Sequence, residues 1–108
     1  MNNVIMQGRL TKMPELRYTV EGLPIVRFSI AVAKKVVKGN GPTADFFDCT
    51  GFGNVAENIN KFFNMGDMIL IKGRLENDNY TNREGVKIYG QVIIIEEWGY
   101  GPKKRENV

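Results

Sequence analysis

Apolar residues recur at every second position through most of this chain, a pattern typical of strands that turn one face to a core. In the segment IVRFSIAVA, alternation places Val26, Phe28 and Ile30 on one face of a strand. Strands of this kind are expected at residues 2–10, 25–33, 44–52, 68–76 and 86–98. Gly73, inside the fourth of them, indicates a bulge or bend. The pattern therefore predicts an all-β fold.

One segment changes to a helical period. Apolar side chains in GNVAENINKFFNMGD fall one turn apart, at Val55, Ile59, Phe62 and Phe63. Asn54 is expected to cap the helix, with Glu57 as its capping-box partner, and Gly66 to end the segment. The helix would lie between the third and fourth of five strands. This order predicts a five-stranded OB-fold barrel over residues 1–99, because a β-sandwich would need more strands and no helix.

Composition excludes several kinds of active site. The chain has no histidine and one cysteine, so the common metal sites and the Ser-His-Asp and Cys-His nucleophiles cannot be assembled. No phosphate-binding glycine loop is present, and no pair of carboxylates stands out for acid-base work. We therefore expect no enzyme, no metal and no cofactor.

Composition restricts the binding partner and the cellular compartment less than it restricts the active site. The net charge of +3 permits an anionic partner without requiring one, since a basic surface can simply be solvated. No stretch predicts a signal peptide or a membrane span, and a single cysteine fits a reducing, cytoplasmic setting.

The segment DFFDCTGF raises the question of which rings are core. One face of this strand would carry Phe46, Asp48, Thr50 and Phe52, and the other Phe47, Cys49 and Gly51. A core face would not carry an unpaired aspartate, because burying a charge is costly. Phe46 and Phe52 are therefore predicted to be exposed rings. The alternative is that a loop or a partner subunit covers this face.

Other segments place cations near isolated aromatic residues. Tyr80 lies in a predicted hairpin, and the accompanying cations are Lys34, Lys35, Lys38, Lys72, Arg74, Arg83 and Lys87. Cations neutralise phosphates and aromatic rings stack on bases, which is the combination that a single-stranded nucleic acid requires. The sequence therefore predicts a surface that binds single-stranded nucleic acid.

At this point the chain resembles the bacterial single-stranded DNA-binding proteins. GRLTKMPELRYT matches the family pattern nearly throughout, with Met13 in place of the usual aspartate, and residues 44–93 resemble the remainder. The resemblance covers about residues 1–98. It implies an OB-fold that binds single-stranded DNA without sequence preference, usually as a homotetramer. The implied roles are DNA replication, recombination and repair, and base stacking in a basic groove is the mechanism for which this family is the standard example.

The family's stacking rings can be transferred position by position. They fall on Phe46, Phe52 and Tyr80, whereas a further one falls on Val36, which is not aromatic. Asp48 stands where some relatives have a basic or neutral residue, and it should repel phosphate unless a lysine pairs with it. The resemblance therefore implies a stacking surface with one ring fewer and one negative charge more.

The C-terminal segment departs from the family. Relatives generally continue into a flexible linker with an acidic tip that recruits replication and repair proteins, whereas residues 100–108 form a short basic tail. Either a naturally short member or a shortened chain would end this way. Lys103, Lys104 and Arg105 would attract nucleic acid or remain solvated. An alternative function is therefore a primosome or recombination accessory protein of the same fold that acts mainly through protein contacts.

Overall fold

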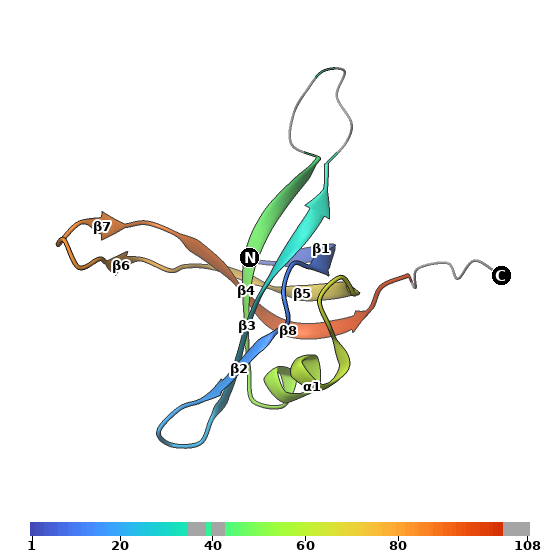
Figure 1. The fold of residues 1–108 in the computed structure, drawn as a ribbon, viewed down its shortest axis with the longest axis horizontal. Helices are drawn as coiled ribbons and strands as arrows, with labels where there is room; N and C mark the ends of the chain where they lie inside the picture. The colour runs from blue at the N-terminus through green and yellow to red at the C-terminus, as the bar shows by residue number, and fades with distance from the viewer. Residues whose placement is uncertain (35–38, 40–42, 103–108) are drawn as a thin grey trace.

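The computed structural model describes residues 1–34, 39 and 43–102, and most of its regular secondary structure is strand (Figure 1). Its elements are β1 (Val4–Leu10), β2 (Glu15–Tyr18), β3 (Pro24–Ala33), β4 (Ala44–Phe52), α1 (Asn54–Phe62), β5 (Met68–Asn77), β6 (Tyr80–Thr81), β7 (Lys87–Ile88) and β8 (Gln91–Tyr100). Among the described residues, no helix is long and apolar enough to cross a bilayer.

Five strands close into a barrel in the order β1-β5-β8-β4-β3, and β3 returns to pair with β1. Two of these joins are short. Strand β1 meets β3 only at Arg9 and Leu10, and the parallel pairing of β4 with β8 is limited to Cys49 with Ile93 and Thr50 with Ile94. The predicted OB-type barrel with a single helix is confirmed.

The helix follows the fourth strand of the chain and not the third, because the structure contains one early strand that was not predicted. Residues 15–18, which follow Pro14, form β2 and pair with β3, so α1 lies between the fourth and fifth strands of the chain. Prolines and a glycine dominate the local sequence here and indicate only turns. The strand forms because Leu16 aligns with Val26 on β3, a pairing that no local pattern reports.

The predicted helix cap is wrong. Gly53, not Asn54, is the N-cap residue, and no side chain caps the helix. Gly53 has a φ of 65°, which glycine adopts without strain and asparagine adopts less readily. The helix also ends at Phe62, four residues before Gly66, and the Phe63 backbone N–H donates to the Ile59 carbonyl.

The core fills the barrel and extends under α1. Its fully buried side chains come from every barrel strand and from the helix, and the largest are Leu10, Val26, Ile30, Ile59, Phe63, Ile69, Ile71 and Ile93. The predicted irregularity at Gly73 is confirmed by a shift of the β5–β8 register between Lys72 and Gly73. A Cβ at Gly73 would lie 1.9 Å from the Ile94 carbonyl oxygen, so only glycine fits this close approach.

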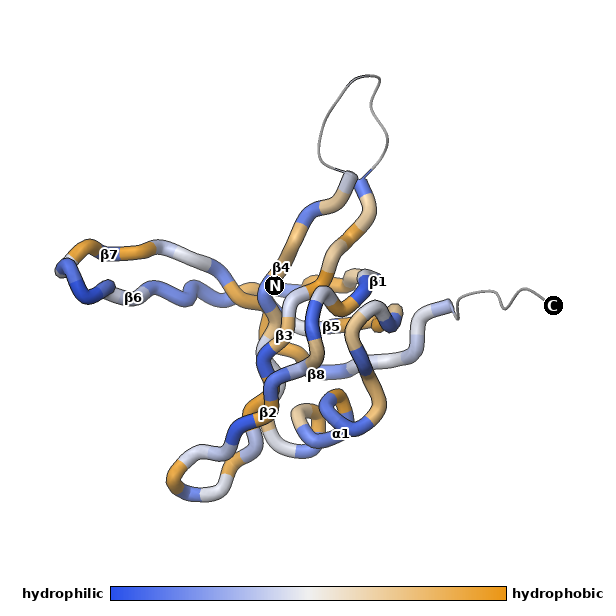
Figure 2. Tube along the Cα trace, in the orientation of Figure 1, coloured by the Kyte–Doolittle hydropathy of each residue, from blue (hydrophilic) through white to orange (hydrophobic). Residues whose placement is uncertain are grey.

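Beyond the barrel, β5 and β8 continue as a two-stranded ribbon that ends in the β6–β7 hairpin (Figure 1). We call residues 76–92 the arm. The Asp78 backbone N–H donates to the Gly90 carbonyl at 2.9 Å, and Tyr80 aligns with Ile88. The arm is hydrophilic along β6 and more hydrophobic along β7 (Figure 2).

Candidate nucleic-acid interface

Strand β4 separates core side chains from exposed rings by simple alternation. Phe46 is 68% exposed and Phe52 is 41% exposed, whereas Cys49 is buried and Phe47 is partly buried against the core. The predicted orientation of both exposed rings is therefore confirmed. Both rings therefore keep free surface within the described part of the chain.

Phe52 and Tyr80 line the same open groove, of about 690 Å³, although 28 positions separate them in the sequence. The groove lies where the arm leaves the barrel. Its floor comes from β3 and β4, and its sides come from the start of β2 and from the arm. Tyr80 is 59% exposed, so both rings present free surface. Phe46 is exposed on the same strand but lies outside the groove lining.

Two cations in the groove lining were missed by sequence reasoning. Lys12 precedes β2, and Arg27 lies on β3 directly opposite Thr50 of β4. The signal for Arg27 was available, since alternation places it on the polar face of its strand. For Lys12 no local signal exists, because only the folding of the chain brings it to the groove.

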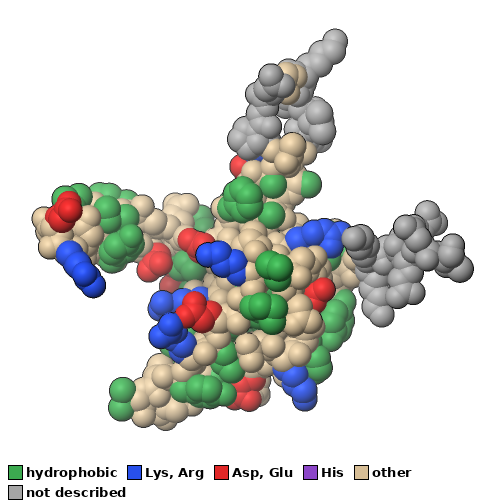
Figure 3. Space-filling view, in the orientation of Figure 1, with side chains coloured by type: hydrophobic (Ala, Val, Ile, Leu, Met, Phe, Trp, Pro, Cys, Tyr) green, Lys and Arg blue, Asp and Glu red, His purple; other side chains and the backbone are tan. Residues whose placement is uncertain are grey.

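Carboxylates outnumber cations around the groove. The described lining includes Glu15, Asp48, Glu76 and Asp78 against Lys12 and Arg27. Figure 3 shows the same intermixing of basic and acidic side chains on one whole face of the molecule. A hydrogen bond from Arg17 holds the pKa of the Glu15 carboxyl below its usual range, so this group stays ionised. A phosphate entering the groove would therefore meet both attraction and repulsion.

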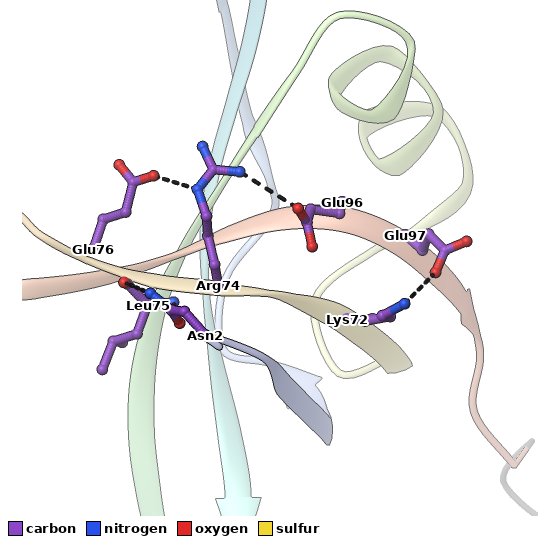
Figure 4. Close-up of polar contacts among 7 residues, drawn as sticks. All are labelled: Asn2, Lys72, Arg74, Leu75, Glu76, Glu96 and Glu97. Carbon is purple, nitrogen blue, oxygen red and sulfur yellow. Dashed lines mark hydrogen bonds and ion pairs between the residues drawn. The ribbon is translucent and has the colours of Figure 1, made fainter.

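Lys72 and Arg74 lie elsewhere, on the outer side of β5 (Figure 4). Each is already paired with carboxylates. Lys72 Nζ lies 3.4 Å from a carboxylate oxygen of Glu97, and Arg74 bonds Glu76 and reaches Glu96 at 3.5 Å. Neither cation lines the groove. Lys72 is thus separated from the rings with which the sequence pattern grouped it, whereas Arg74 reaches the edge of the groove through its bond to Glu76, which lines the groove.

The remaining predicted cations lie outside the groove lining or outside the described residues. Lys34 follows β3 and its Nζ lies 3.1 Å from an Asp45 carboxylate oxygen. Arg83 and Lys87 are exposed at the tip of the arm. Lys35, Val36 and Lys38 lie outside the described residues, as do Lys103, Lys104 and Arg105.

Cys49 lies beneath the floor of the groove, and its thiol is not reactive. Its side chain is buried, and desolvation raises the pKa of the thiol to about 12. The thiol is therefore protonated at neutral pH and poorly nucleophilic. In the described residues, no group of three or more potential ligand side chains is placed to hold a metal ion.

Comparison with known proteins identifies the family of the chain. Residues 1–100 match the model of the single-strand binding protein family. The chain belongs to that family. Similar proteins include a single-stranded DNA-binding protein of Fusobacterium nucleatum, 41% identical over 107 residues, and single-stranded DNA-binding protein 2 of Listeria monocytogenes, 35% identical over 109 residues.

The aligned region makes up nearly all of this chain but a smaller fraction of each relative's length. The Fusobacterium and Listeria alignments span 96% and 100% of this chain and 69% and 68% of those proteins. A single-stranded DNA-binding protein of Lactiplantibacillus plantarum is 36% identical over 98% of this chain, which spans only 54% of that protein's length. These relatives therefore extend beyond the region that they share with this chain.

Proposed function

We propose that this protein binds single-stranded DNA without sequence preference and protects it during replication, recombination and repair. The observation that supports the proposal most directly is the placement of Phe52 and Tyr80 in one groove, with Phe46 exposed on the same strand. Bases are flat on both faces, so stacking on these rings tolerates any sequence. The role requires binding alone, and it places the protein in the bacterial cytoplasm, where DNA is unwound.

The proposed path of the strand follows the rings. Phe46, Phe52 and Tyr80 would stack on bases, and cations beside the path would neutralise phosphates. Of the described cations, Lys12 and Arg27 line the groove, and Lys34, Arg83 and Lys87 are exposed outside its lining. Lys35 and Lys38 remain proposed contacts, whereas Lys72 and Arg74 would contribute only if the strand continued around the outside of β5.

We further propose a homotetramer, as the family implies. Strand β1 pairs with β5 along Val4–Arg9, but β3 covers its other edge only at Arg9 and Leu10. Ile5 on this strand is 75% exposed. An open edge and an exposed isoleucine favour association with a second copy. Light scattering with and without oligo-dT of increasing length would give the subunit number and the occluded length together.

A fluorescence-anisotropy titration tests the proposed function. A labelled single-stranded oligonucleotide is bound by the protein, and an unlabelled single strand or an unlabelled duplex of the same length is added as competitor. The single strand should displace the label at much lower concentration, because stacking needs unpaired bases. Equal competition by the duplex would refute the proposal.

The accessory role remains a second candidate, and it is favoured by the two groove carboxylates that join none of the described ion pairs, Asp48 and Asp78. Such a protein would bind DNA weakly on its own and a replication or recombination protein strongly. Capture of a defined partner from cell extract treated with nuclease, together with weak anisotropy binding, would support it. Tight binding to an oligonucleotide alone would exclude it as the main activity.

A further inference from the structure

Asp48 occupies the centre of the surface that carries the exposed rings. It lies on the outer face of β4 between Phe46 and Phe52, opposite Ser29 of β3. Its side chain is exposed and lines the groove with Thr50 and Phe52. Residues two apart on a strand are ~7 Å apart, so Asp48 is one side-chain width from Phe46 and ~13 Å from Phe52.

The carboxylate of Asp48 has no cation bound to it within the described part of the chain. The ion pairs there join Lys34 to Asp45, and Arg17, Lys72 and Arg74 to glutamates. The nearest cation in its strand register is Arg27, which lies opposite Thr50 and forms no ion pair with Asp48. Asp48 therefore presents a carboxylate with free acceptor sites to whatever occupies the groove.

A free carboxylate in the groove limits how a DNA strand can be oriented there. It repels phosphate, so the backbone should run along the rims of the groove and turn its bases toward the floor. A carboxylate accepts hydrogen bonds and donates none. It can therefore bond the exocyclic amino group of cytosine or adenine, and the neighbouring N–H and amino groups of guanine. Thymine offers two carbonyl oxygens, which a carboxylate repels, and a single ring N–H.

We propose that Asp48 gives this groove a base preference, favouring bases with an exocyclic amino group over thymine. The inference rests on the proposed binding of single-stranded DNA, and it replaces the proposed lack of sequence preference by a modest selection among bases at this one position. Stacking on Phe52 and Tyr80 supplies affinity for any base, and Asp48 adds a hydrogen bond that thymine matches poorly. The selection is modest, because Asp48 is exposed and water competes for the same bond.

Competition titrations with oligo-dC and oligo-dT of equal length test the proposal in a mildly alkaline buffer that keeps cytosine unprotonated. The measured quantity is the ratio of the Kd for oligo-dT to the Kd for oligo-dC. Asp48→Ala should lower this ratio by about threefold to tenfold, the effect expected from one solvent-exposed hydrogen bond. Asp48→Asn should lower it less, since an amide can accept from cytosine and also donate to thymine.

A charge control separates base reading from general repulsion. Glu57→Gln on α1 also removes one negative charge, and Glu57 is exposed and outside the groove lining. It should leave the ratio unchanged, even if both oligonucleotides bind slightly more tightly. An unchanged ratio in both Asp48 variants, with both oligonucleotides bound, would overturn the base preference alone. Failure of the wild-type protein to bind either oligonucleotide would overturn the proposed function with it.

Discussion

Replacing Phe46 and Phe47 by alanine, one at a time, separates binding from folding at two neighbouring positions of β4. Phe46 is 68% exposed, so about a third of its surface is protected from water in the folded chain. Full burial of a phenylalanine contributes about 1.5–3 kcal/mol, so Phe46→Ala should lower the free energy of unfolding by only about 0.5–1 kcal/mol. The same change removes a stacking ring, which should weaken binding of single-stranded DNA by about 1–3 kcal/mol.

Phe47→Ala should do the reverse. Phe47 lies opposite the fully buried Ile30 and packs against the core from its partly buried position. Buried phenylalanines cost about 3–5 kcal/mol when truncated, so partial exposure places Phe47→Ala near 3 kcal/mol of lost stability. Its folded fraction should bind DNA with nearly unchanged affinity, because its ring faces away from the groove.

Two separate signals measure these effects. Trp98 packs against the buried Phe63, with ring centroids 5.4 Å apart, and it lies outside the groove lining, so its fluorescence reports unfolding in urea. Anisotropy of a labelled oligonucleotide reports binding at a denaturant concentration where both variants are folded. A large loss of stability in Phe46→Ala with unchanged affinity would show that its ring belongs to the core and would refute the assignment of the two faces.

Three further outcomes are expected. Gly73→Ala should lower the free energy of unfolding by about 1–3 kcal/mol, because its Cβ would collide with the Ile94 carbonyl oxygen; a thermal melt equal to wild type would contradict this. Cys49 should react with a thiol reagent only after unfolding, and a moderate rise in pH should not speed the native reaction, since burial raises the pKa of its thiol to about 12. Arg27→Ala should weaken DNA binding and lower the slope of affinity against salt by about one, whereas Lys72→Ala, whose cation pairs with Glu97, should change neither; equal effects would place the strand outside the groove.

Features that depend on neighbouring residues could be predicted from the sequence. The exposure of Phe46 and Phe52 and the burial of Cys49 follow from a period of two, which any strand imposes on its own side chains. The irregularity at Gly73 follows from a missing side chain in an otherwise regular strand. These predictions needed no knowledge of which strands pair.

Features that depend on pairing could not be predicted. The β2 strand exists because Leu16 aligns with Val26, and its own sequence reads as a turn between prolines. The cap of α1 depends on Gly53, which has a positive φ and whose backbone N–H donates to the Pro24 carbonyl on β3. The sequence pattern of a capping box was therefore misleading here, because the backbone conformation of Gly53 decides where the helix begins.

The composition of the groove shows the same limit. Tyr80 and Phe52 were predicted as stacking rings, but their common groove follows from the path of the arm. Lys12 joins them only through the fold, and Lys72 was grouped with them although its strand turns it to another side of the barrel. Charge alone could not distinguish a groove cation from one that is paired elsewhere.

The narrow parallel join between β4 and β8 links the groove to the dynamics of the barrel. Only two residue pairs make this join, and one of them, Thr50 with Ile94, also lines the groove. A join with so few aligned backbone pairs has few hydrogen bonds between its strands to oppose local opening, and a ligand that binds only the closed form suppresses that opening. Amide hydrogens along this join should therefore exchange with solvent more slowly when an oligonucleotide is bound. Bound DNA would then stabilise the pairing of β4 with β8 and, with it, the closed barrel.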